Sequence, residues 1–96
     1  MIFGKKKEKK DPIKKMAGVS NQQQAILEYL WREGEITNRT GMLMLNVAKV
    51  DTRVSELRAK GWDLPMTWEK NMTNGGRHGV YHMSYDDAAR YEREML

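Results

Sequence analysis

The stretch from residue 47 to residue 61 constrains the fold most, because its apolar residues have the spacing of one amphipathic helix. They recur at intervals of three and four: Val47, Val50, Val54 and Leu57. Gly61 follows, where a helix commonly ends in a left-handed residue. The spacing predicts a helix over about residues 48–60 with one buried side. The opposite side carries mostly short or hydrogen-bonding side chains: Lys49, Thr52, Ser55 and Glu56, with Arg53 at its flank.

A first helix is predicted upstream, in residues 20–34. Ser20 and Gln23 have the spacing of a capping box, and Gly34 follows the last turn as a helix end. The apolar stripe between them has helical spacing: Ile26, Leu27, Leu30 and Trp31. The three glutamines are expected at an exposed helix start.

A second helix is predicted from Thr37, its N-cap, to about Leu45, after a short extended segment at Ile36. Gly41 in its middle is unfavourable by about 1 kcal/mol relative to alanine, which favours a close helix–helix approach at that position. Asn46 then serves as a left-handed turn residue. Two methionines of this helix are expected to fill the core: Met42 and Met44.

Residues 62–83 predict a β-hairpin with a long tip. Apolar residues alternate on both sides of the tip: Trp62, Leu64, Met66 and Trp68, then Tyr81 and Met83. Pro65 is compatible only with an edge strand. The tip has no acidic residue after Glu69 and carries basic and amide groups: Lys70, Asn71, Asn74, Arg77 and His78.

A short last helix is predicted after Ser84, its N-cap, with Asp86 and Asp87 at the positive end of its dipole. Its apolar side is formed by Ala88, Tyr91 and Met95. The chain is expected to be a monomer or a weak homodimer, with Tyr91 and Met95 as a small dimer contact.

Residues 1–18 are expected to form a flexible basic arm, and residues 19–96 one domain. The arm holds seven lysines against Glu8 and Asp11 and has few apolar residues, so burial cannot repay its ordering entropy. Five lysines cluster near its start: Lys5, Lys6, Lys7, Lys9 and Lys10. The arm is either a solubilising tail or a segment that follows a phosphate backbone. A contact with anionic lipid or RNA is a third interpretation.

Composition excludes several classes of protein. Without cysteine there is no disulfide framework or thiolate metal site, and no apolar run approaches the roughly 20 residues of a membrane span. His78 and His82 lack a third ligand at a sensible spacing, so neither a metal nor another cofactor is expected. No catalytic motif is present, and an enzyme is not expected. The protein is expected in the cytoplasm and away from membranes.

The predicted elements have the order helix, short strand, helix, tight turn, helix, hairpin, helix. This is a mainly α fold with a small β-hairpin, the layout of a winged helix-turn-helix: three helices plus a wing, here with a short C-terminal helix and a basic N-terminal arm. In that motif the third helix enters the major groove of DNA and the hairpin tip reaches the neighbouring backbone or minor groove. The helix over residues 48–60 is then the recognition helix.

Residues 35–64, EITNRTGMLMLNVAKVDTRVSELRAKGWDL, resemble the small winged helix-turn-helix proteins of phages and prophages. The shared pattern is an Ile-Thr start, a small residue within the second helix and an Arg-Val-x-x-Leu-Arg-x-x-Gly helix, followed by a hairpin ending in Tyr-x-apolar. The resemblance covers about residues 22–84. Gly41 stands where alanine is more usual and Asn46 where glycine often stands; both keep the geometry. Asp51 departs further, because it places a negative charge near phosphates.

The resemblance implies sequence-specific binding of double-stranded DNA by a phage or mobile-element protein, as a transcriptional regulator or a recombination accessory factor. The predicted DNA contacts lie on the helices, the turn and the wing: Arg39, Asn46, Lys49, Thr52, Arg53, Lys70, Asn74 and Arg77. The alternative is a winged-helix protein–protein module that inhibits a host enzyme. Four features favour this alternative: Asp51, Glu56, the net charge of −1 over residues 19–96 and the two tryptophans on the hairpin side, Trp62 and Trp68.

Overall fold

The computed structural model describes residues 14–96, and its first helix is α2 (Asn21–Glu33). The predicted capping box is confirmed: Ser20 Oγ accepts a hydrogen bond from the Gln23 backbone, and the Gln23 side chain accepts one from the Ser20 backbone. Gly34 ends the helix with a φ of 93°. The expected exposure of the glutamines is wrong for two of them, because Gln23 and Gln24 are buried. Their side chains bond segments outside α2 that the sequence pattern did not connect to it.

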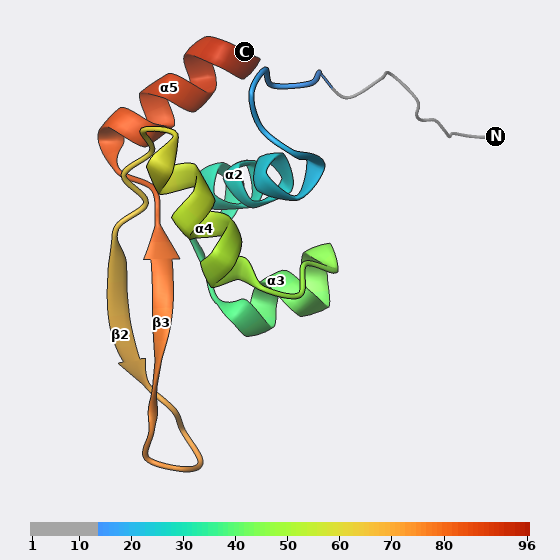
Figure 1. The fold of residues 1–96 in the computed structure, drawn as a ribbon. Helices are drawn as coiled ribbons and strands as arrows, with labels where there is room; N and C mark the ends of the chain where they lie inside the picture. The colour runs from blue at the N-terminus through green and yellow to red at the C-terminus, as the bar shows by residue number, and fades with distance from the viewer. Residues whose placement is uncertain (1–13) are drawn as a thin grey trace, which may run out of the picture.

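Strand β1 (Glu35–Ile36) leads into the helix-turn-helix formed by α3 (Asn38–Leu45) and α4 (Val50–Ala59). The close approach predicted at Gly41 is confirmed, since an added Cβ would overlap the Val50 side chain of α4. The turn between the helices is also confirmed: Asn46 has the left-handed φ of 57°. A residue without a side chain therefore sets how closely α4 crosses α3 (Figure 1).

The sheet has three antiparallel strands in the order β1-β3-β2, with β2 (Met66–Lys70) and β3 (Arg77–His82) forming the hairpin. Figure 1 shows this hairpin projecting past the helices as a wing. β3 is central because β1 pairs with its end, Ile36 opposite Tyr81. The strand predicted from Trp62 begins later, at Met66. Trp62 and Leu64 are buried ahead of it, and Leu64 has a left-handed φ of 39°.

Helix α5 (Tyr85–Met95) begins at Ser84 with a capping box to Asp87. Asp87 does more than interact with the helix dipole: its buried carboxylate accepts hydrogen bonds from the backbone N–H groups of Asp63 and Leu64, both at 2.8 Å. A third comes from the Ser84 N–H at 3.1 Å. One side chain therefore joins the entry and the exit of the wing to α5.

The dimer contact expected on α5 does not agree with the position of Tyr91. This side chain is buried and stacks on Trp31 of α2, with ring centroids 5.4 Å apart and an interplanar angle of 29°. The Trp31 Nε1–H donates to Glu92 Oε2 at 3.0 Å. Tyr91 is therefore used inside the protomer to dock α5 on α2.

The hydrophobic core lies where α2, α4 and the base of the sheet meet. The predicted core face of α4 is confirmed, because its apolar residues are all buried: Val50, Val54 and Leu57, with Val47 just before them. The expected core role of the α3 methionines is wrong. Met42 is 55% exposed and Met44 66% exposed, and Leu43 between them is 68% exposed. Gly41 and Ile36, rather than the methionines, supply the packing on this side.

The last residues of the expected arm pack against α2. Met16 is only 4% exposed, and its N–H donates to Gln24 Oε1 at 2.9 Å. The Gln24 amide in turn donates to the Lys14 carbonyl at 2.7 Å, and Lys60 Nζ donates to the Gly18 carbonyl at 2.7 Å. The packed part of the chain therefore includes residues before 19. The five clustered lysines lie outside the described residues: Lys5, Lys6, Lys7, Lys9 and Lys10.

Candidate nucleic-acid interface

Helix α4 presents a row of exposed, small or flexible side chains away from the core. Lys49, Thr52 and Ser55 are exposed, while Val50 and Val54 point into the core. The row follows from helical spacing, since positions three apart share one face. It offers two hydroxyl groups and one ammonium group for hydrogen bonding.

The N-terminus of α4 is capped from outside the helix. The Lys49 side chain makes no capping bond; instead Asn38 Oδ1 of α3 accepts from the Asp51 N–H at 3.1 Å. Asp51 Oδ1 accepts from the Thr52 N–H at 3.0 Å. Asn38 and Asp51 therefore each satisfy one backbone donor of the first turn that would otherwise lack a partner, which gives the acidic Asp51 a structural role.

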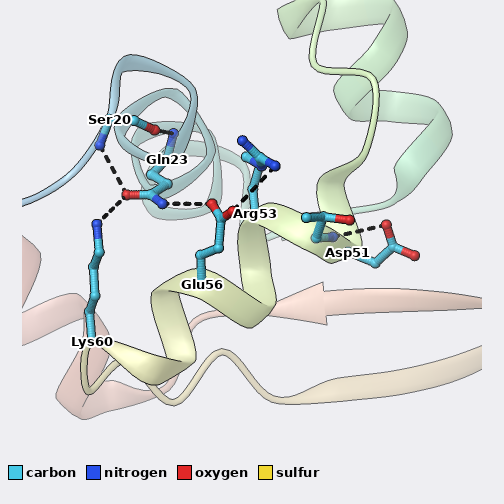
Figure 2. Close-up of polar contacts among 7 residues, drawn as sticks. Ser20, Gln23, Asp51, Arg53, Glu56 and Lys60 are labelled. Atoms are coloured by element: carbon cyan, nitrogen blue, oxygen red, sulfur yellow. Dashed lines mark hydrogen bonds and ion pairs between the residues drawn. The ribbon is translucent and has the colours of Figure 1, made fainter.

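Arg53 lies toward α2 rather than on the outward row. Its guanidinium is 3.3 Å from Glu56 Oε2, and Glu56 Oε1 accepts from Gln23 Nε2 at 2.8 Å. Gln23 Oε1 accepts from Lys60 Nζ at 2.8 Å, so the chain of contacts ties both ends of α4 to the start of α2 (Figure 2). The Arg53 Nε–H is buried without a partner in residues 14–96. Arg53 of α4 and its C-cap residue Lys60 are thus engaged within the fold.

Arg58 braces α4 against the wing and contacts no acidic side chain within residues 14–96. It donates to the Leu64 carbonyl at 2.6 Å and lies over the Tyr81 ring, 5.6 Å from the centroid. α4 is therefore held over the Tyr81 face of the sheet. Burial raises the pKa of Tyr81, the Asp51 carboxylate raises this pKa further, and Arg58 acts in the opposite direction.

One face of the wing carries its cations and a tryptophan. The register pairs Met66 with Tyr81, Trp68 with Gly79 and Lys70 with Arg77, and alternate residues of a strand share a face. Trp68, Lys70 and Arg77 are exposed. No ion pair within the described part of the chain involves Lys70 or Arg77. We call this set of three residues the aromatic wing face.

The other face of the wing is internally bonded. His78 Nε2 lies 3.8 Å from Glu69 Oε1, and His78 Nδ1 lies 2.6 Å from Asn71 Oδ1. Asn74 Oδ1 accepts from the Gly76 N–H at 2.9 Å and from Asn71 Nδ2 at 3.0 Å. Asn74, a predicted DNA contact, therefore uses its carbonyl oxygen to shape the tip.

A groove separates the wing from the start of α3. It brings two predicted DNA contacts together, Arg39 from α3 and Lys70 from β2, with Thr37, Asn74 and His78 also along its walls. Arg39 and Asn46 are both exposed, Asn46 in the turn that precedes α4. The predicted set is thus divided between the outward row of α4, the groove, the wing and the turn before α4, and Arg53 lies apart from all of these beside Glu56.

Sequence reasoning missed two residues that matter here. Ser55 was placed on the polar side of the helix but not among the DNA contacts, although its spacing of three from Thr52 gives both the same face. Trp68 was taken as an alternating apolar residue and, with Trp62, as support for a protein–protein interface, but not as a DNA contact; it is 60% exposed. The alternation of residues along the hairpin could have shown this, because Trp68 lies two residues beyond Met66, whose pair with Tyr81 is the last on that face to pack on the core.

Metal-binding clusters and membrane-spanning helices are both absent from residues 14–96. No group of three or more His, Asp or Glu side chains is arranged to hold a metal ion. None of the helices in that range combines the length and the apolar character that crossing a bilayer requires.

Comparison with known proteins places this geometry in a family. Residues 21–85 match the family described as "Winged helix-turn-helix domain", which covers α2 through the whole wing to the first residue of α5. Domains of this kind are typical of DNA-binding proteins without enzymatic activity. Searches of curated proteins and of solved structures gave no match.

Proposed function

The chain belongs to the winged helix-turn-helix family, and we propose that it binds double-stranded DNA with α4 in the major groove and the wing on the adjacent backbone. The observation that carries the proposal is the exposed row of Lys49, Thr52 and Ser55 beside a wing whose Lys70 and Arg77 have no acidic partner in residues 14–96. Phosphate contacts position a protein on DNA, and contacts to base edges give specificity.

Within this proposal the residues divide by role. Lys49 and Thr52 read base edges, because they are exposed and outward. Arg53 reaches DNA only by leaving Glu56, from which it is 3.3 Å away, so its contribution is smaller. The remaining predicted contacts act on phosphates or the groove edge: Arg39, Asn46, Lys70, Asn74 and Arg77. The lysines of the N-terminal arm add sequence-independent phosphate contacts.

The finer proposal is a sequence-specific protein of a phage or mobile element that acts in the host cytoplasm as a transcriptional regulator or recombination accessory factor. It is supported by the resemblance of residues 35–64 to phage and prophage proteins and by the net charge of +5 in residues 1–18. The charge supports association with a polyanion.

The test of DNA reading is a selection from random duplex DNA, followed by affinity measurements on the selected site and on unrelated DNA. Thr52→Ala should weaken binding to the selected site by about 1–3 kcal/mol and leave unrelated DNA unchanged. Ala59→Ser, an exposed change at the far end of the helix, is the control. A selection that yields no enriched sequence, with Thr52→Ala binding every duplex as the parent does, would refute base reading by α4.

A second candidate function is a protein–protein module that inhibits a host enzyme. The observation in its favour is the exposed apolar set on α3, Met42, Leu43 and Met44, which no DNA contact requires. Leu43→Asp should abolish binding to such a protein partner while DNA affinity is kept. Retained DNA binding in a variant that has lost its biological effect would favour this function.

A further inference from the structure

The aromatic wing face combines an exposed indole with two cations on one side of a two-stranded ribbon. Met66 and Tyr81 form the last pair of this face that packs on the core, and the Trp68–Gly79 pair comes next toward the tip. Trp68 is therefore beyond the core and 60% exposed. Its exposure is a consequence of register, because a shift by one residue would turn it to the other face.

Gly79 leaves the strand opposite Trp68 without a side chain. A Cβ at Gly79 would lie 2.7 Å from Met66 Sδ and 4.0 Å from Cζ3 of the Trp68 ring. The indole therefore lies beside the backbone of β3 at Gly79, while more than half of its surface faces solvent. An exposed flat aromatic surface on a strand resembles the platforms on which bases stack.

The charge around the indole is positive. Lys70 and Arg77 form the next cross-strand pair on the same face. Their side chains are long enough to reach the Trp68 ring from this neighbouring pair. The nearest acidic residue of the wing, Glu69, is on the opposite face beside His78. An aromatic ring with two neighbouring cations matches a base and the phosphates on either side of it, whereas a protein partner would need acidic groups around an apolar pocket.

We propose that the aromatic wing face binds an unstacked base of DNA next to the duplex held by α4, with the base on Trp68 and its flanking phosphates at Lys70 and Arg77. The inference rests on the proposed function and deepens it, because it names the DNA form that the protein prefers: a duplex bordered by a single strand or by an opened base pair. A wing that contacts only the phosphates of a duplex needs Lys70 and Arg77 but has no use for an exposed Trp68.

The test compares a blunt duplex that contains the selected site with the same duplex carrying a short single-stranded extension at the wing side. The extension should increase affinity at least about fivefold, the lower limit for one base stacked on an aromatic residue. Trp68→Ala should remove this gain and change blunt-duplex affinity less than twofold. Trp68→Phe, which keeps an aromatic ring, should retain most of the gain. A 2-aminopurine in the extension should be quenched by the parent protein and not by Trp68→Ala.

The outcomes separate this inference from the proposed function. Equal loss of blunt and extended binding in Trp68→Ala, with an unchanged melting temperature, would overturn the inference and assign Trp68 to the duplex. An extension that gives no gain in affinity for the parent protein would also overturn it. If Trp68→Ala binds both DNA forms as the parent does but loses a protein partner, Trp68 belongs to a protein interface instead. Gain from the extension without any blunt-duplex binding would support the inference and refute duplex recognition by α4.

Discussion

Helix α4 and the wing both carry cations, and they use them differently. On α4, Arg53 contacts Glu56, Arg58 donates to the Leu64 carbonyl, and Lys60 donates to Gln23 and Gly18. On the wing, Lys70 and Arg77 are exposed and take part in none of the ion pairs among residues 14–96. Apart from the exposed Lys49, the cations of the predicted recognition helix thus hold the fold together, and those of the wing remain available to a ligand. We therefore expect the wing to contribute mainly to DNA affinity, through phosphate contacts, and α4 to contribute mainly to sequence selectivity.

The largest effect is expected from the buried side of α4. Leu57→Ala removes a fully buried side chain from the core and should lower the free energy of unfolding by about 2–5 kcal/mol. Chemical denaturation measures this change. Ser55→Ala on the exposed row is the control and should stay within about 0.5 kcal/mol of the parent. Similar losses in both variants would contradict the division of α4 into a core side and a free side.

A smaller effect is expected where the α4 cations are engaged. Glu56→Ala removes the acceptor for the Arg53 guanidinium and the Gln23 amide, and should cost about 1–3 kcal/mol of stability. The free energy of unfolding is measured for Glu56→Ala and for Glu69→Ala, whose carboxylate lies on the wing. A cost at Glu56 no larger than that at Glu69 would show that the network in Figure 2 does not stabilise α4.

Removing the cations of the wing should leave stability within about 0.5 kcal/mol, since both side chains are exposed. The double variant Lys70→Ala with Arg77→Ala should instead reduce the slope of log K against log salt by about 1.8, because each phosphate contact contributes about 0.9. Titrations at several salt concentrations measure the slope. The same measurement on Arg32→Ala with Arg93→Ala, far from the wing, is the control. An unchanged slope in the wing variant would place the phosphate contacts elsewhere.

The smallest effect concerns Tyr81, where α4 meets the wing, and is confined to alkaline pH. Burial raises the pKa of this phenol in the folded state above its usual value of about 10. The stability that follows is fully present below pH 10 and is lost as the pH rises through the folded pKa. Tyr81→Phe should therefore reduce the alkaline loss of stability. Tyr85→Phe, at a side chain that is 96% exposed, is the matched control, and equal pH profiles for the two variants would contradict the assignment.

The features that sequence predicted correctly are local ones. Capping at Ser20, the left-handed turn at Asn46 and the close approach at Gly41 each depend on a few neighbouring residues and their backbone angles. The winged helix-turn-helix fold follows from their order, and the family match agrees with it. Periodicity also identified the buried side of α4.

The features that sequence missed depend on distant partners. Gln24 is buried because Lys14 and Met16 fold back on it, and Arg58 turns toward the Leu64 carbonyl and the Tyr81 ring. Met42 is exposed because nothing in residues 14–96 covers that side of α3. Helical spacing gives the direction of a side chain relative to its own helix, but it does not give the element that will stand opposite.

The carboxylate of Asp87 has a consequence for how the protein can diversify. It holds the N–H groups of Asp63 and Leu64 on one side of the wing and that of Ser84 on the other. Between these anchors, Met66 and Tyr81 pack on the core, but the exposed part of the tip at residues 72–76 can change in length or composition without disturbing the junction with α5. Exposed loop tips tolerate insertions well. The tip of the wing can therefore vary in sequence, and with it the ligand that the wing contacts, while the Asp87 hydrogen bonds keep the base of the wing joined to α5.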